Sequence, residues 1–318
     1  MHKNKQKLRI TNFLMIKTLL DFKPIELSDK TQVVQIIKNN NYRSSDISFA
    51  NLFAWSSRFS TQIAIKDNTF FIRSGNCYLF PIGELPIKDA LNLILDNEKD
   101  NYNNIKMCGI TLEMWEEINK SLPNVFEYHL NRDEYEYIYL SEKLINLKGK
   151  KLQSKRNHIN KFKNKYKDWQ YQKITSQLQI QECITMLDEW EKSVSYRIAP
   201  SQNDEYIAAK KMLENFDFLQ LTVGAIKVNE KVVAFSVGEP LTEDTFVVHI
   251  EKAFEDIDGA YSIINQQFIE HEAHSFKYIN REEDLGFENL RKAKISYQPE
   301  MLLEQGFCMM ISKVSMAL

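Results

Sequence analysis

The chain has few of the residues that interrupt helices and strands or that form covalent cross-links. Its 318 residues include only 9 glycines, 7 prolines and 4 cysteines. So few glycines and prolines exclude long linkers and low-complexity tracts. No stretch approaches the roughly 18 apolar residues that a membrane-spanning helix requires. The length is therefore available for two ordinary domains, each with its own core.

The cysteines lie far apart and form no CxxC pair; they are Cys77, Cys108, Cys183 and Cys308. We expect them to be buried, reduced thiols, which favours a cytoplasmic protein. The basic N-terminus lacks the small-residue cleavage site of a signal peptide. His271 and His274 form HEAH rather than HExxH and have no third ligand in view, so we expect no metal site.

Acidic residues are missing from one segment. Between positions 148 and 167 there are nine Lys or Arg residues and no Asp or Glu. Apolar residues recur there at roughly helical spacing, which predicts a cationic helix with a narrow apolar stripe of Leu152, Ile159, Phe162 and Tyr166. Such a helix can contact a polyanion or an anionic membrane surface, or it can be a solvated connection between domains. The candidate nucleic-acid contacts are Lys151, Lys155, Arg156, His158, Lys161 and Lys163.

The first half predicts a mixed α/β unit over residues 22–147, after an N-terminal arm at residues 1–21. Its expected helices are 28–39, 87–98 and 112–121, and its expected strands are 63–65, 69–73, 77–81 and 135–140. Tight turns are expected at Asp67-Asn68 and Gly75-Asn76, and in the second half of the chain at Asn229-Glu230.

The basic segment, residues 148–168, connects this unit to a second one over residues 169–318. The second unit has expected helices at 177–192, 204–216 and 259–274 and expected strands at 219–228, 231–239, 245–251 and 276–280. Helices, antiparallel strands, a further helix and a last strand follow each other in both halves. This repeated order predicts a duplicated domain.

The strand at 245–251 carries a candidate catalytic pair. Simple alternation turns His249 and Glu251 to one face, and Phe246, Val248 and Ile250 to the other. Burying a carboxylate and an imidazole is costly unless both are partnered. The pair predicts a general base, Glu251, oriented by His249. The alternative is a structural pair held by Arg or Tyr residues of an adjacent strand.

The next helix places two polar residues, Tyr261 and Asn265, on the same face as Ile264 and Phe268. An amide among apolar neighbours can orient an acceptor amine or a substrate carbonyl. The alternative for Asn265 is a hydrogen bond to the backbone inside the core.

Charged residues gather where the last predicted strand ends, in NREED (280–284) and LRKAKISYQP (290–299). A sheet holds such groups rigidly at its rim, which is a frequent way to build a site. We expect this rim to face His249 and Glu251 from the neighbouring strand. Arg291 and Lys294 share a helical face and predict a clamp for a carboxylate, a phosphate or the 3′ end of a tRNA. Ion pairs with the neighbouring acids are the alternative. The other candidates for substrate binding here are Arg281, Glu283, Asp284 and Tyr297.

The order of the second half, an antiparallel meander, a crossover helix and a diverging strand, is that of the GNAT acyltransferase fold. Six segments resemble the DUF2156 family: KLQSKRNHINKF (151–162), VVAFSVGE (232–239), HIEKA (249–253), GAYSIINQQF (259–268), NREEDLG (280–286) and LRKAKISYQP (290–299). That family is similar to the C-terminal domain of phosphatidylglycerol lysyltransferases. The resemblance implies two tandem GNAT-like domains of the α+β type, related to enzymes that take an amino acid from aminoacyl-tRNA.

Ordinary GNAT enzymes bind the pyrophosphate of CoA in a glycine-rich loop at the start of the crossover helix. Here that loop reads FEDIDGAYS, with one glycine, no arginine and three carboxylates, Glu255, Asp256 and Asp258. These carboxylates would repel a pyrophosphate, so CoA is disfavoured there.

The resemblance and the residues together predict an aminoacyltransferase. It would use aminoacyl-tRNA, without a further cofactor, and pass the amino acid to an amine or hydroxyl of a lipid, a peptide or a small molecule. The alternatives are an acyl-CoA-dependent N-acyltransferase and a non-catalytic protein that binds RNA or a ligand. The lysyltransferases carry a membrane-embedded portion that this sequence does not show, so membrane contact would be peripheral.

Overall fold

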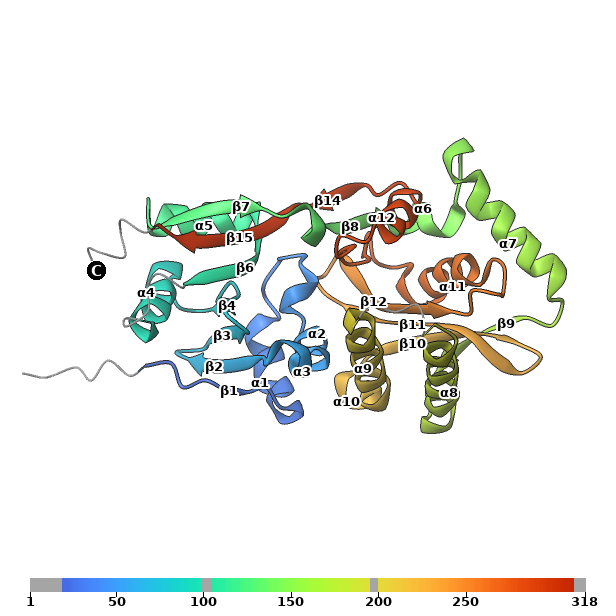
Figure 1. Cartoon of the computed structure of the whole chain (residues 1–318), viewed down its shortest axis with the longest axis horizontal. Coiled ribbons are helices and arrows are strands. Elements are labelled where there is room, and N and C mark those ends of the chain that lie inside the picture. The colour runs from blue at the N-terminus through green and yellow to red at the C-terminus, as the bar shows by residue number, and fades with distance from the viewer. Residues whose placement is uncertain (1–18, 99–104, 195–199, 312–318) are drawn as a thin grey trace, which may run out of the picture.

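The computed structural model describes residues 19–98, 105–194 and 200–311 and contains two mixed β-sheets, one in each half of an elongated molecule (Figure 1). The predicted N-terminal arm lies almost wholly outside the described residues. Helices flank both sheets, so the α+β class predicted from the sequence is confirmed.

The first sheet has the strand order β1-β2-β3-β4-β6-β15-β7, and β5 pairs with β3. Its strands are β1 (Lys23–Pro24), β2 (Gln62–Lys66), β3 (Thr69–Ser74), β4 (Cys77–Tyr78), β5 (Ile82–Gly83), β6 (Lys106–Thr111), β7 (Phe126–Leu130) and β15 (Gln305–Met310). The helices of this half are α1 (Lys30–Ile37), α2 (Phe49–Ala54), α3 (Ser56–Phe59), α4 (Ile87–Asn97) and α5 (Leu112–Ser121).

The second sheet has the order β14-β8-β13-β12-β11-β10-β9. Its strands are β8 (Glu136–Leu140), β9 (Gln170–Ile174), β10 (Thr222–Val228), β11 (Lys231–Pro240), β12 (Thr245–Ala253), β13 (Tyr278–Asn280) and β14 (Met301–Leu303). The helices are α6 (Ser141–Asn146), α7 (Gln153–Lys165), α8 (Gln177–Val194), α9 (Pro200–Glu214), α10 (Phe216–Leu219), α11 (Ala260–Phe268) and α12 (Glu288–Ile295). A π-helical turn, Ile269–Ala273, continues α11.

Two strands cross between the halves. β8 was expected to close the first unit, but it lies in the second sheet between β13 and β14. β15, near the C-terminus, lies in the first sheet between β6 and β7. The sheets therefore divide the chain differently from the predicted boundaries at residues 147 and 169.

The predicted hairpin turns are confirmed by the backbone. Asp67 and Asn68 both have positive φ, 47° and 52°, and so do Asn229 and Glu230, at 48° and 62°. Two consecutive positive φ values are the signature of a type I′ turn, whose twist matches the strands it joins. The crossover helix and the basic helix also form where the periodicity predicts them, as α11 and α7.

Strand β12 departs from its predicted alternation. Ile250 pairs with Val237 and Val248 pairs with Gly238, which leaves His249 without a partner on β11. One extra residue on one strand is a β-bulge, and it changes which face the following side chains occupy. Phe246 and Val248 consequently belong to a different core cluster from Ile250. The expectation that His249 and Glu251 share a simple face is therefore wrong.

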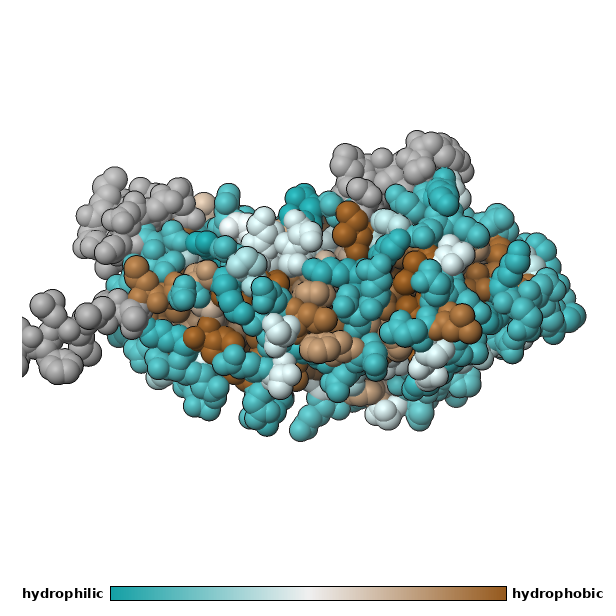
Figure 2. Space-filling view, turned by 90° about the horizontal axis from the view of Figure 1, so that it is seen from below, coloured by the Kyte–Doolittle hydropathy of each residue, from teal (hydrophilic) through white to brown (hydrophobic). Residues whose placement is uncertain are grey.

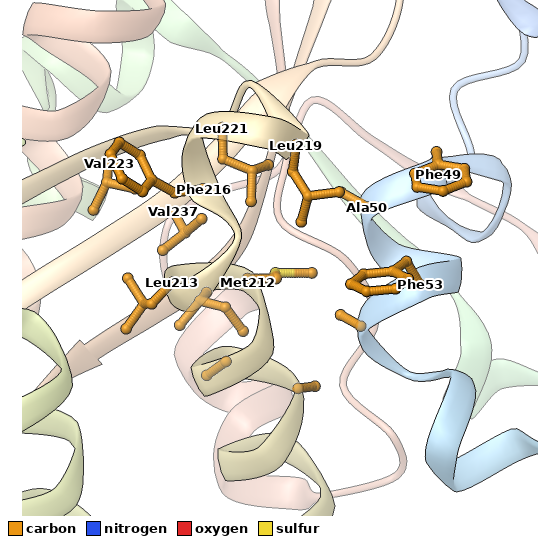
Figure 3. Close-up of a cluster of buried hydrophobic side chains, with 14 of the residues drawn as sticks. Phe49, Ala50, Phe53, Met212, Leu213, Phe216, Leu219, Leu221, Val223 and Val237 are labelled. Carbon is orange, nitrogen blue, oxygen red and sulfur yellow. The ribbon is translucent and has the colours of Figure 1, made fainter. Parts of the chain in front are cut away.

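One hydrophobic cluster joins the halves. Figure 3 shows Phe53 of α2 facing Met212 of α9, and both belong to one cluster with Phe49, Leu219 and Val237. A second cluster packs on the second sheet alone, and a third packs on the first sheet alone. The face in Figure 2 is mostly hydrophilic with small hydrophobic groups between, as expected when large apolar side chains are mostly inside.

Two cysteines differ from the prediction. Cys77 of β4 and Cys108 of β6 form a disulfide, because the sheet places their Cα atoms 5.7 Å apart. Cys183 and Cys308 are free and buried, as predicted. The cysteines therefore no longer support the expected cytoplasmic location. Within the described residues, every helix is too short or too polar to cross a membrane.

Candidate active site at the diverging strands

The candidate site begins where two parallel strands separate. β12 and β13 pair over three residues only, Thr245–Val247 with Tyr278–Asn280. Beyond this point the later half of β12 faces the NREED segment across the gap. The predicted proximity of these segments is confirmed, since Arg281 contacts Glu251 and Glu282 contacts His249.

Glu251 is held from two sides. Arg281 Nη2 donates to Glu251 Oε1 at 2.9 Å, and Asn265 Nδ2 of α11 donates to Glu251 Oε2 at 2.9 Å. The Glu251 and Arg281 side chains are only 13% and 12% exposed, so this ion pair is nearly buried. Asn265 thus bonds to a side chain across the core, not to the backbone.

Two polar atoms of this group have no partner within the described residues. They are Asn265 Oδ1, an acceptor, and Arg281 Nη1, a donor, and both atoms are buried. A buried polar atom without a hydrogen bond costs about 1–3 kcal/mol. Such atoms mark a position at which a ligand with complementary groups would be stabilised.

His249 lies between two carboxylates and not against Glu251. Its Nδ1 is 2.7 Å from Glu282 Oε1 and its Nε2 is 3.1 Å from Glu239 Oε1, which also accepts from Ser48 Oγ at 2.5 Å. Burial alone would lower the pKa of His249, but the two hydrogen bonds outweigh it and raise the pKa to about 10. The imidazole is therefore protonated at neutral pH and cannot accept a further proton.

Tyr297 forms an aromatic wall beside Glu251. Arg281 Cζ lies 4.9 Å from the centre of its ring, and Lys155 Nζ of α7 lies 4.1 Å from the same centre. Arg281 also lies over the ring of Tyr139, at 5.6 Å. Burial and the neighbouring Arg281 both lower the pKa of Lys155. The basic helix thus reaches the predicted catalytic carboxylate through Lys155. We call Lys155, Glu251, Asn265, Arg281 and Tyr297 the Glu251 cluster.

A second set of carboxylates lies beside His249, and the sequence reasoning found only part of it. Burial, with Glu134 and Glu282, raises the pKa of Asp46 to about 7. Burial, with Glu282 and Asp46, raises the pKa of Glu283 to about 8. Glu136 of β8 is fully buried and accepts from Ser45 Oγ and Asn280 Nδ2. Asp46 and Glu136 were missed because the sequence does not show that β8 and the first half reach this point.

Arg291 forms ion pairs with acidic side chains, which was the alternative to a clamp for a substrate. Its guanidinium donates to both oxygens of Asp284, at 2.9 and 2.8 Å, and to Asp133 at 2.7 Å. Asp284 is fully buried and also accepts from the Tyr137 hydroxyl at 2.5 Å. Burial alone would raise the pKa of Asp284, but these donors lower it to about 2. This group fixes the start of α12.

Lys294 also turns inward. Its ammonium donates to the carbonyl oxygens of Arg281, Glu282 and Glu283, and burial lowers its pKa. It thereby holds the backbone that carries the two ion pairs of the site. Tyr261 is 38% exposed and its hydroxyl hydrogen-bonds to the backbone of Ala253, so it lies at the margin of the site.

The predicted nucleic-acid contacts on α7, and Lys151 just before it, have different surroundings. Arg156 donates to the carbonyl oxygens of Leu147 and Gly149, and His158 and Lys161 contact Asp258. Lys163 lies over the ring of Trp169, and Lys151 is exposed. The apolar stripe is buried at Leu152, Ile159 and Phe162 as predicted.

Helix α7 also covers the start of the crossover helix. Gly259 precedes α11 with φ of 87°, and a Cβ atom there would lie 2.5 Å from the carbonyl oxygen of His158. Only glycine allows the two backbones to approach so closely. The first turn of α11, where GNAT enzymes bind a pyrophosphate, is therefore packed against protein.

A meander, a crossover helix and two diverging strands define the second sheet as a GNAT-like acyltransferase fold. The sequence profile of the family described as "Phosphatidylglycerol lysyltransferase, C-terminal" matches residues 38–307, and the chain belongs to this family. The resemblance found in the sequence is thus confirmed.

Among the solved structures that are similar to this chain are three with a TM-score above 0.6. A conserved protein of unknown function from Bacteroides thetaiotaomicron is 39% identical, with a TM-score of 0.85 over 92% of this chain and 100% of that one. A C-terminal DUF2156 domain from Agrobacterium fabrum is 12% identical, with a TM-score of 0.63 over 91% and 94%. L-PGS from Bacillus licheniformis is 13% identical, with a TM-score of 0.62 over 93% and 96%. The last two similarities support the fold alone.

Proposed function

We propose that the protein transfers an amino acid from aminoacyl-tRNA to an amine or hydroxyl group at the Glu251 cluster. The family supports an aminoacyltransferase-like role. The observation that carries the proposal is a buried carboxylate with an unsatisfied acceptor beside it, reached by a lysine of the basic helix.

The α-ammonium group of an aminoacyl ester matches the acceptors in this cluster. Asn265 Oδ1 lacks a donor, and Asn265 Nδ2 already fixes Glu251 close by. An ammonium group donating to Asn265 Oδ1 and Glu251 would satisfy both. Because the side chains of Glu251 and Arg281 are nearly buried, these contacts are stronger than they would be in water.

Glu251 is also the proposed general base. The acceptor amine or hydroxyl attacks the ester carbonyl carbon, and Glu251 takes the proton that the acceptor loses. The new amide or ester bond forms as the bond to the tRNA 3′ oxygen breaks, and Glu251 passes the proton that it took to this leaving oxygen. His249 is already protonated, so its proposed role is to position β12 against Glu239 and Glu282.

Two features make CoA a poorer donor for this site. α7 packs on Gly259, and the acidic loop beside it directs Asp258 at Lys161 and His158. The gap between β12 and β13, where a pantetheine arm would enter, is bridged by the Glu251–Arg281 and His249–Glu282 pairs. CoA binding would have to break these contacts.

The acceptor is proposed by class only. A lipid acceptor fits the family, while a peptide or a small amine fits the chemistry equally. The carboxylates around Asp46 and Glu283, which lie beside His249, repel one another and would favour a cationic aminoacyl side chain over an anionic one.

The test is turnover of charged tRNA by the whole protein. Loss of labelled amino acid from tRNAs charged one at a time would be followed with phosphatidylglycerol vesicles or with small amines as acceptors. Glu251→Gln is expected to lower turnover about 10²–10⁴-fold while tRNA binding persists. Glu288→Gln, the same change at an exposed position of α12, is the matched control.

Binding of tRNA without turnover of any charged tRNA would contradict the proposal and favour a non-catalytic RNA-binding protein. Calorimetric binding of CoA by the wild type, together with acyl transfer from it, would favour the acyl-CoA alternative.

A further inference from the structure

The positive charges around Tyr297 exceed the negative ones. Lys155 and Arg281 both lie over this ring, and Glu251 is the carboxylate that acts on both cations. Glu251 is already bonded to Arg281 Nη2 and Asn265. One of the two cations is therefore without a neutralising partner.

Lys155 is that cation. Within the described residues it makes no ion pair, whereas Lys161 on the same helix pairs with Asp258. Its ammonium lies over an aromatic face instead, in a half-buried position beside another cation. A partly desolvated ammonium next to a guanidinium is an unfavourable arrangement in the absence of an anion.

Arg281 offers the second half of an anion site. Its Nη1 is a buried donor without an acceptor, while its Nη2 is bonded to Glu251. A guanidinium can place two N–H groups on one anion, and it is suited to phosphate oxygens.

We infer that Lys155 and Arg281, beside the ring of Tyr297, form a subsite for a phosphodiester group of the substrate. The inference rests on the proposed function. In the aminoacyl ester the amino acid has no free carboxylate, so the anion must come from another part of a substrate. A phosphodiester occurs next to the 3′-terminal adenosine of tRNA and also in a glycerophospholipid headgroup. Lys155 belongs to the basic helix, which is the side on which a polyanion would be held.

Calorimetry on the whole protein tests this subsite with two probes. Cytidylyl-(3′→5′)-adenosine represents the end of tRNA, and glycerophosphoglycerol represents a lipid headgroup. Lys155→Gln is expected to weaken binding of the preferred probe about ten- to a hundredfold, since a hydrogen bond to a charged group is lost. Adenosine and glycerol, which lack the phosphate, are expected to be insensitive to the substitution.

Lys106→Gln is the matched control. Lys106 of β6 lies 4.1 Å from the centre of the Phe307 ring, as Lys155 lies from Tyr297, but it is in the first sheet. The control is expected to bind the probe as the wild type does. Binding that is equal in wild type and Lys155→Gln, or no saturable binding of either probe by the wild type, would overturn the subsite.

The outcomes separate the subsite from the transferase proposal. Turnover of charged tRNA that Lys155→Gln leaves unchanged, without phosphodiester binding, would remove the subsite alone. Lys155-dependent binding of a phosphodiester without turnover of any charged tRNA would establish the subsite and remove the transferase. The probe that binds identifies the source of the phosphate.

Discussion

Each sheet contains a corresponding pair of parallel strands, and the two pairs are held together by different kinds of bond. Each contains a pair of parallel strands joined through a crossover helix, β4 and β6 through α4, and β12 and β13 through α11. In the first sheet the pair is fastened by the Cys77–Cys108 disulfide beside buried apolar residues such as Phe80. In the second sheet the gap is crossed by the Glu251–Arg281 and His249–Glu282 ion pairs.

The difference shows why a site is expected in one half and not in the other. A disulfide and apolar side chains are complete as they stand, because they leave no polar atom in need of a partner. The nearly buried charged side chains of the second sheet hold the strands together and, within the described residues, leave Asn265 Oδ1 and Arg281 Nη1 without a partner. In the second sheet the same charged residues thus stabilise the fold and can bind a ligand.

Removing one charge from the second gap should have the largest effect on stability. Arg281→Met leaves Glu251 buried without its cation, which is expected to cost about 3–5 kcal/mol of unfolding free energy. Denaturant unfolding followed by circular dichroism measures it. Arg58→Met, which breaks the more exposed pair with Asp204, is the control and should cost less than about 1 kcal/mol. Equal losses of unfolding free energy would show that the Glu251–Arg281 pair stabilises the fold no more than an exposed ion pair does.

Removing the disulfide of the first sheet should lower the unfolding free energy somewhat less than the loss of Arg281. The disulfide closes a segment of 31 residues, and its loss through Cys77→Ser is expected to lower the unfolding free energy by about 2–4 kcal/mol. A reductant should lower the unfolding free energy of the wild type to that of the variant and leave the variant's value unchanged. A wild type that is insensitive to reductant would show that the bond does not support the first sheet.

The third expected effect is a pH dependence of the unfolding free energy that belongs to the second sheet. The pKa of His249 is raised from its ordinary value of 6.5 to about 10, so its stabilising contribution is complete below pH 6.5 and is lost as the pH rises towards 10. His249→Gln should flatten the stability curve in this window, because glutamine does not titrate. The exposed His129 of β7 serves as control, and His129→Gln should leave the curve parallel to that of the wild type. A parallel curve for His249→Gln would contradict the assignment.

Local patterns predicted much of the fold, because turns and helices depend on residues near in sequence. The periodicity of α7 and the Asp67-Asn68 turn are examples. Strand partners are chosen by tertiary packing, so β8 was placed in the wrong sheet and β15 was not predicted. The Cys77–Cys108 bond was missed for the same reason, since only the pairing of β4 with β6 brings the two thiols together.

The candidate site was predicted in its location but not in its contacts. The sequence brought Arg281 and Glu282 to the strand that carries His249 and Glu251, and the structure confirms it. A bulge cannot be read from alternation, so the separate partners of His249 and Glu251 were not foreseen. Asp46 arrives from a distant 3₁₀ turn, at Ser45–Ile47, which no motif connects to the site.

The exchange of β8 and β15 between the sheets has a consequence for any attempt to cut the chain in two. A fragment that ends at residue 168 would lack β15 and expose the facing edges of β6 and β7, which invite pairing with other molecules. The complementary fragment would lack β8, leaving β13 and β14 without the strand between them. Neither fragment therefore contains a complete sheet, and we expect the two halves of the chain to fold only together.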